Sequence, residues 1–206
     1  MTEQEKSGEA ISYLRAGTHD NLIRSISFIS KQTNIPESYL RFKSAREYCT
    51  ENELKWVQDV RKRVKRQTKE TIGGMIIYGK PDNLPMAKKM LAIGATLVRN
   101  FVDVRVFTIT KLLSMLDDRY ADTGYQECSV LIIPDLCTEG FDVPTKQIHK
   151  LYGFLLQRFV EDKLVIGYVD SMSAIEDNYG STFYQQIKEH YDLFDGTLAT
   201  EIEAAV

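Results

Sequence analysis

Short apolar runs alternate with amphipathic helical segments through most of this chain, and that alternation constrains the fold more than any other feature. The runs predicted to be strands cover residues 75–78, 102–109, 129–133 and 164–169. Helices are predicted over residues 86–98, 111–120, 145–162 and 182–191. Because strands that alternate with helices form mainly parallel sheets with right-handed crossovers, the sequence predicts an α/β fold.

The part of the chain before this alternation is predicted to be helical. Residues 1–33 form a helical extension, in which Leu22, Ile26 and Ile29 have the spacing of one helix face. That face could bind a partner or pack on the protein's own core, and both alternatives stay open. An Asn-Ile-Pro sequence interrupts the pattern at residues 34–36. We therefore divide the chain into the extension, a helical connector over residues 34–73, and an α/β core over residues 74–206.

The composition excludes several classes of protein. With 206 residues, 43% of them hydrophobic, the chain can bury a core without disulfide or metal staples. The net charge of −3 gives no global attraction to nucleic acid. Cys49, Cys128 and Cys137 lack paired metal-ligand spacing and the histidines are scattered, so we expect reduced thiols and no metal site. No apolar run has the length of a membrane span, and the polar N-terminus does not resemble a signal peptide, so we expect a cytoplasmic protein.

One basic run stands out against this acidic background. It consists of Arg61, Lys62, Arg63, Lys65 and Arg66. Such a run could contact the phosphates of DNA, in which case the affinity should fall steeply with salt. The alternative is a solvated face of the connector helix.

Residues 75–90, MIIYGKPDNLPMAKKM, have the outline of a phosphate-binding loop. An apolar strand leads into Gly79 and Lys80, and a predicted helix follows from Met86. A working loop of this kind surrounds phosphates with backbone amides and adds a lysine and a hydroxyl for Mg²⁺. The outline is present here, but the lysine and the hydroxyl are missing from the end of the loop.

The order of four segments resembles the DnaC/DnaI/IstB group of AAA+ proteins, which are helicase loaders and transposition helper ATPases. Residues 35–39, IPESY, resemble the family's entry into the ATPase core, and residues 74–81, GMIIYGKP, resemble its strand and loop opening. Residues 110–120 resemble the helix after the second strand, and residues 130–136, VLIIPDL, the Walker B strand. The resemblance implies an AAA+-like P-loop NTPase fold of three layers, with extra N-terminal helices.

The same resemblance shows that the nucleotide site is degenerate. Pro85 falls at the family's lysine position and Met86 at its Ser/Thr position. On the Walker B strand, Pro134 replaces the acid that helps to hold Mg²⁺, and Asp135 replaces the acid that polarises water. Proline has no N–H and no charge to offer a phosphate.

A third element of the family site is also changed. The segment that supplies an arginine to a neighbouring subunit corresponds to residues 180–186, GSTFYQQ, which contain no cation. Asp170 and Ser171 stand where the family usually has a Thr/Ser-Asn pair. Phosphoryl transfer depends on positioning and positive charge, so these losses together predict a pseudo-ATPase that uses neither ATP nor Mg²⁺.

The function expected from this resemblance is a non-catalytic, DnaC-like replication accessory that binds a replicative helicase or its loader. One alternative is an ATPase with an unorthodox site, in which Lys80 or Lys88 binds phosphates and Asp135 binds Mg²⁺. Another is an IstB-like transposition helper that binds DNA and a transposase. AAA+ rings assemble through nucleotide held between subunits, so we expect a monomer, dimer or hetero-complex in preference to a closed ring.

Overall fold

The computed structural model describes residues 25–66, 73–80, 85–118, 123–139 and 143–197. The backbone of the basic run lies within the first of these ranges, while the side chains of residues 61–63, 65 and 66 lie outside the description. Everything stated below concerns the described residues.

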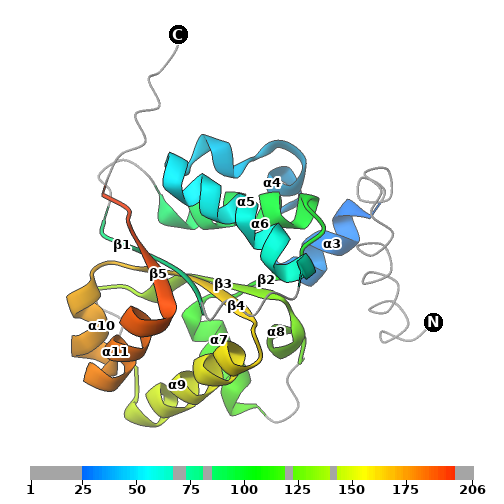
Figure 1. The fold of residues 1–206 in the computed structure, drawn as a ribbon. Helices are drawn as coiled ribbons and strands as arrows, with labels where there is room; N and C mark the ends of the chain where they lie inside the picture. The colour runs from blue at the N-terminus through cyan, green and yellow to red at the C-terminus, as the bar shows by residue number, and fades with distance from the viewer. Residues whose placement is uncertain (1–24, 67–72, 81–84, 119–122, 140–142, 198–206) are drawn as a thin grey trace.

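A parallel sheet of five strands forms the middle of the molecule (Figure 1). The strands are β1 (Gly74–Tyr78), β2 (Val104–Val106), β3 (Val130–Cys137), β4 (Leu164–Val169) and β5 (Tyr191–Asp195). Their order is β2-β3-β4-β1-β5, and every neighbouring pair is parallel. This confirms the predicted α/β class and places β1 and β4, both rich in apolar residues, in the interior of the sheet.

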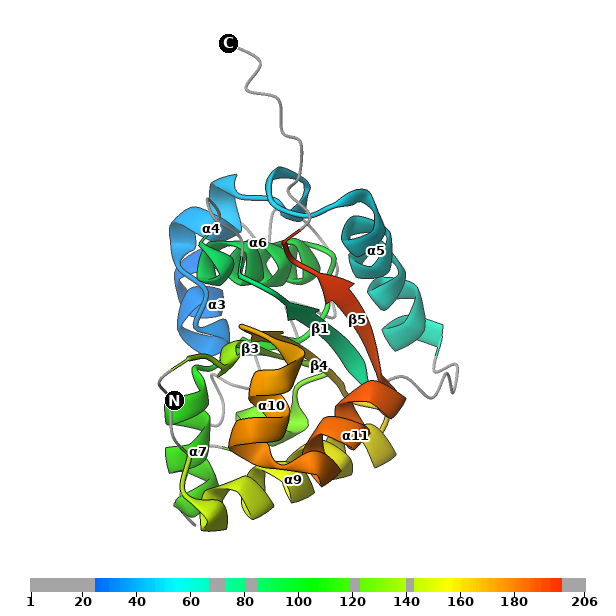
Figure 2. The same ribbon diagram turned by 90° about the vertical axis from the view of Figure 1, so that its left-hand side faces the viewer.

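Helices cover both faces of the sheet, which gives three layers (Figure 1). One face is covered by α3 (Ile26–Thr33), α4 (Glu37–Phe42), the short 3₁₀ helix η1 (Ala45–Glu47), α5 (Glu51–Arg66) and α6 (Met86–Arg99). The other is covered by α7 (Ile109–Asp117), α8 (Gly124–Glu127), α9 (Thr145–Val160), α10 (Met172–Tyr179) and α11 (Ser181–His190). Figure 2 shows the same layers after a quarter turn, with α5 beside the edge strand β5.

The alternation of side chains along the strands explains the two cores. Met75 and Ile77 of β1 pack in the core under α3–α6, while Ile76 between them packs in the core under α7–α11. Ile132 and Ile133 of β3 are divided between the two cores in the same way. Successive strand residues point to opposite faces, so a continuous apolar run supplies both cores at once.

Several predicted boundaries were wrong. The strand predicted over residues 102–109 is only three residues long, because the side chain of Thr108 accepts a hydrogen bond from the N–H of Lys111 and starts α7. The strand predicted over 129–133 continues to Cys137 through an irregularity in its pairing with β4. The helix α10 and the strand β5 were not predicted, while β4 matches its prediction.

The predicted boundary at residue 33 does not separate two cores. Ile26 and Ile29 of α3 are buried in the same core as the sheet. Asn34 ends this helix in a left-handed conformation and donates a hydrogen bond from Nδ2 to the carbonyl of Val106 at 3.0 Å. The helix α3 is therefore part of the α/β core, whereas residues 1–24 lie outside the described part of the chain.

Candidate functional site

The carboxyl ends of four strands meet at one edge of the sheet, where ligands bind in open α/β folds. The pairing register aligns Tyr78 of β1 with Val169 of β4 and Asp195 of β5, and it aligns Cys137 of β3 with Val169. Gly79 and Lys80 of the predicted nucleotide site follow β1, and Asp135 lies near the end of β3. We call this region the carboxyl edge.

At the end of β1, the segment after β5 packs closely on Gly79, the first residue of the loop. Gly79 has a φ of 95° and donates its N–H to the carbonyl of Val169 at 3.2 Å. A Cβ atom added at Gly79 would lie 2.7 Å from Cγ2 of Thr197, so a side chain does not fit there. Gly196 also donates its N–H to the carbonyl of Tyr78 at 2.7 Å. The glycine is therefore required by close contact with the segment after β5.

Lys80 faces a carboxylate on a neighbouring loop. Its Nζ lies 3.4 Å from Oε2 of Glu139, and both side chains are largely exposed. An exposed pair of this kind contributes little to stability. It nevertheless places a negative charge beside the one cation of the loop opening that the structure describes.

The start of α6 has neither the lysine nor the hydroxyl side chain with which the family's loop binds phosphate and Mg²⁺. Pro85 precedes the helix, and its side chain makes no capping hydrogen bond. Met86, at the position of the family's hydroxyl, is only 7% exposed and packs in the core under α3–α6. The first helical residue is thus used for packing, and the residue before it has no N–H to donate.

Asp135 caps a helix. Its Oδ1 accepts a hydrogen bond from the backbone N–H of Ile109, the first residue of α7, at 2.8 Å. Pro134 lies in the irregular part of the pairing between β3 and β4. Burial raises the pKa of the Asp135 carboxyl, and the bond from Ile109 opposes that shift. The one acid left on the Walker B strand therefore satisfies a helix N-terminus.

Asp170, at the end of β4, is also held by the protein. Its Oδ2 accepts from the N–H of Glu139 at 2.6 Å, and its Oδ1 accepts from the hydroxyl of Tyr168 at 2.8 Å. Burial and the neighbouring Asp170 raise the pKa of Tyr168, so its hydroxyl keeps its proton. At the end of β5, Oδ1 of Asp195 accepts bonds from the N–H and the hydroxyl of Thr197.

These residues do not fit a magnesium nucleotide. At the ends of β1, β3, β4 and β5 the structure describes four carboxylates, of Asp135, Glu139, Asp170 and Asp195, and one ammonium group, that of Lys80. A second lysine, Lys88, is exposed at the third position of α6. A triphosphate needs the opposite balance of charge. The described residues also contain no cluster of three or more His, Cys, Asp or Glu side chains suited to a metal ion.

Two further sets of residues were singled out in the sequence. The basic run forms the end of α5, but its side chains at residues 61–63, 65 and 66 lie outside the description. Leu22 also lies outside the described residues, while Ile26 and Ile29 are buried. A partner could therefore use these two isoleucines only after α3 left its place on the sheet.

Similarity to solved structures supports the fold independently of the sequence patterns. No family model matches the sequence, and no curated protein matches it. Solved structures do match. A candidate primosome component from Streptococcus pyogenes serotype M3 is 12% identical, with a TM-score of 0.55 over 81% of this chain and 93% of that chain. The DnaC helicase loader is 16% identical, with a TM-score of 0.54 over 76% and 97% of the two chains.

A third structure is the replication initiator DnaA from Aquifex aeolicus with AMPPCP bound. It is 10% identical, with a TM-score of 0.56 over 78% of this chain. The chain shares the α/β P-loop NTPase-like fold of these three structures. It spans half of that DnaA chain and almost all of the DnaC chain. The similarity to DnaC confirms the predicted P-loop architecture.

A search for membrane-spanning helices found none among the described residues.

Proposed function

We propose that this protein is a DnaC-like accessory of DNA replication that binds a replicative helicase or its loader and works without hydrolysing ATP. The observation that carries the proposal is the contact between Asp135 and the N–H of Ile109. An ATPase needs an acid at this position that is free to polarise the attacking water. Here the carboxylate of Asp135 accepts a hydrogen bond from the start of α7 instead.

The other groups of the carboxyl edge support the same proposal. Catalysis of phosphoryl transfer depends on cations and on correctly placed donors around the phosphates. Here Lys80 faces Glu139, Asp170 is bound by its neighbours, and Pro85 has replaced the catalytic lysine. The alternative is an ATPase in which Lys80 or Lys88 binds the phosphates and Asp135 binds Mg²⁺. It is less favoured, because Asp135 already caps α7 and Lys80 faces Glu139.

Without a phosphate-dependent switch, this protein would act through occupancy and assembly. It would hold a helicase, cap a loader oligomer or inhibit a loader. Its partners are proposed from the DnaC-like fold, and DNA contact through residues 61–66 is a further part of the proposal. The same argument favours a monomer, dimer or hetero-complex, because no nucleotide would join neighbouring subunits.

The partner can be tested by capture of the tagged full chain from its native cells, with and without added ATP. We expect a replicative helicase or its loader to be recovered in equal amounts under both conditions. Capture with the triple variant Arg61→Glu, Arg63→Glu and Arg66→Glu separates protein contact from DNA bridging, since only the latter should be lost. Recovery of a transposase, or of no replication protein, would contradict the proposal.

A further inference from the structure

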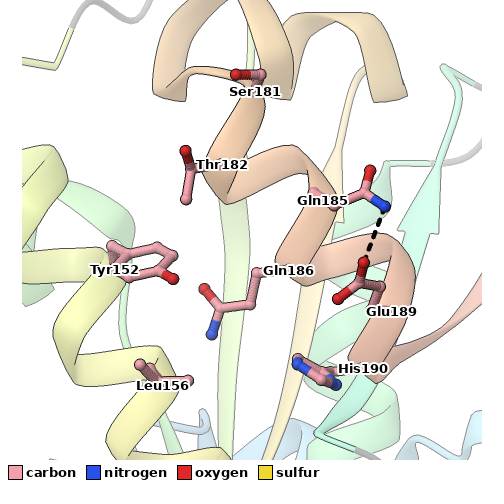
Figure 3. A pocket seen from close by; sticks show the side chains of 8 residues that line it. All are labelled: Tyr152, Leu156, Ser181, Thr182, Gln185, Gln186, Glu189 and His190. Carbon is pink, nitrogen blue, oxygen red and sulfur yellow. Dashed lines mark hydrogen bonds between the residues drawn. The ribbon is translucent and has the colours of Figure 1, made fainter.

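A pocket lies between α9 and α11, on the opposite face of the sheet from α3–α6 (Figures 1 and 3). Its volume is about 510 Å³, which is within the range of sites for small ligands and peptide segments. Tyr152 and Leu156 of α9 form one wall, and α11 contributes the other residues from Ser181 to His190. The proposed function assigns no role to this pocket.

Gln186 is the unusual residue of this pocket. It is only 6% exposed, and among the residues that the structure describes neither Oε1 nor Nε2 of its side chain has a hydrogen-bond partner. Figure 3 shows its carboxamide directed from α11 toward Tyr152 and Leu156 on α9. Buried polar groups are almost always paired, so an amide with both atoms unpaired needs an explanation. A binding partner that supplies one donor and one acceptor would provide it.

The two ends of the pocket differ in charge. At one end α11 begins at Ser181 without a side-chain cap, so the N–H groups of its first turn have no partner within the helix. These groups carry the positive end of the helix dipole. At the other end lies Glu189, whose Oε1 accepts from Nε2 of Gln185 at 2.9 Å. The distance along the helix from Thr182 to Glu189 is about 10 Å.

We propose that this pocket binds an extended peptide segment of a partner protein through Gln186. The side-chain Oε1 would accept from a peptide N–H, and Nε2 would donate to a peptide carbonyl. An acidic group of the segment would face Ser181 and Thr182, and a basic group would face Glu189. An extended chain covers about 10 Å with roughly three residues, which sets the spacing between the two groups.

Access to the amide requires a side-chain movement. Neither polar atom of Gln186 is exposed to solvent, although the residue lines the pocket. Rotation about the torsions of Gln186 or Tyr152, from one staggered rotamer to another, would bring the amide to the pocket surface. Tyr152 and Leu156 then offer an apolar surface to a side chain of the segment.

The chemistry of the pocket favours an extended peptide over two other ligands. None of the eight described residues that line it is Lys or Arg, and Glu189 adds a negative charge, so a nucleic-acid backbone has no cation to neutralise it. A bound α-helix would already have paired its own main-chain amides, and would leave Gln186 unsatisfied. An extended segment has free peptide groups along its length. The inference does not depend on the proposed role in replication.

The test is a selection of phage-displayed random peptides on the full-length protein, followed by fluorescence anisotropy with the selected peptides. We expect selected peptides to carry an acid and a base about three residues apart. Gln186→Leu should weaken them about tenfold, because two hydrogen bonds are lost. Gln157→Leu is the matched control, since Gln157 lies on α9 outside the pocket and bonds to Glu161. This control should bind as the wild type does.

A second variant keeps the test valid if Gln186→Leu folds poorly. Glu189 is exposed, so Glu189→Lys should fold normally, and it should reject the selected peptides at their basic end. Gln186→Leu itself should unfold at the same or a higher temperature than the wild type, because it removes an unpaired buried amide. Failure to select any peptide, or peptide affinities unchanged by Gln186→Leu, would overturn the proposal. If adenosine bound through Gln186 and no peptide bound, the proposal would be overturned, and the pocket would be a site for a nucleobase.

Discussion

Replacing Lys89 by Met is expected to destabilise the protein by about 3–5 kcal/mol. Nζ of Lys89 lies 2.6 Å from Oε1 of Glu53, and the two side chains are 3% and 1% exposed. The second oxygen, Oε2 of Glu53, accepts from the N–H of Thr50 at 2.7 Å. Loss of the ammonium group would leave a buried carboxylate with no neutralising charge. Burial and Glu53 raise the pKa of the neighbouring Cys49 to about 12, so this thiol stays neutral and adds no charge to the site.

This prediction can be measured by urea unfolding at neutral pH. Lys88→Met is the matched control, because Lys88 precedes Lys89 on α6 but is exposed, and it should change stability by less than about 0.5 kcal/mol. The double variant Lys89→Met and Glu53→Leu should recover most of the loss, since apolar groups often replace a buried ion pair without cost. Equal stability of Lys89→Met and the wild type would show that this pair is unimportant. The ion pair joins α5 of the connector to α6, the helix that follows β1 in the chain.

The second large effect is expected from Arg158→Met, at about 3 kcal/mol or more. Arg158 is buried on α9, and its guanidinium donates to four backbone carbonyls. These belong to Tyr125, Gln126, Cys128 and Leu164, at distances of 2.9–3.3 Å. The cation thus holds the end of α8 against the starts of β3 and β4. Methionine would fill part of the volume and would remove the guanidinium donor from the carbonyls of Cys128 and Leu164. The carbonyl of Gln126 would keep its bond from Nζ of Lys163 at 2.9 Å.

Thermal and urea unfolding of three variants separate the contributions of Arg158. Arg158→Met should show the full loss, and Arg158→Lys an intermediate one, because an ammonium group cannot reproduce the planar fork of the guanidinium. Lys146→Met, an exposed change on the same helix, controls for the loss of one positive charge. If Arg158→Met and Lys146→Met were equally stable, the bonds to the four carbonyls would contribute nothing.

Much of the fold could be predicted because its signals are local. The run Leu164–Val169 is apolar throughout and is buried throughout, so its pattern alone identifies an interior strand. The strand β5 was missed because Tyr191–Asp195, YDLFD, follows α11 directly and mixes acids with apolar residues. Its place is fixed by distant contacts, such as the bond of 2.7 Å from Nε1 of Trp56 to Oδ2 of Asp192.

The candidate site was less predictable, because its contacts join residues that are far apart in the sequence. The replacements at Pro85 and Met86 are visible in the sequence once the loop is recognised. The capping bond from Ile109 to Asp135 joins residues far apart in the chain, and so does the pair of Lys80 with Glu139. Nothing in the local sequence marks Gln186 as unpaired, since that depends on how α9 and α11 pack. Residue types were readable from the sequence, whereas partners depend on packing.

The central claim is that this DnaC-like fold has kept its architecture and lost its nucleotide chemistry. Calorimetric titration of the full chain with ATP and Mg²⁺ tests it most directly, with the Aquifex aeolicus DnaA, whose structure contains AMPPCP, as the positive control. We expect no saturable heat of binding for this protein up to about millimolar ATP. A dissociation constant of about 1 mM corresponds to a binding free energy of about −4 kcal/mol, so the titration would detect even weak binding. Micromolar affinity, or ATP turnover that Asp135→Asn abolishes, would contradict the claim.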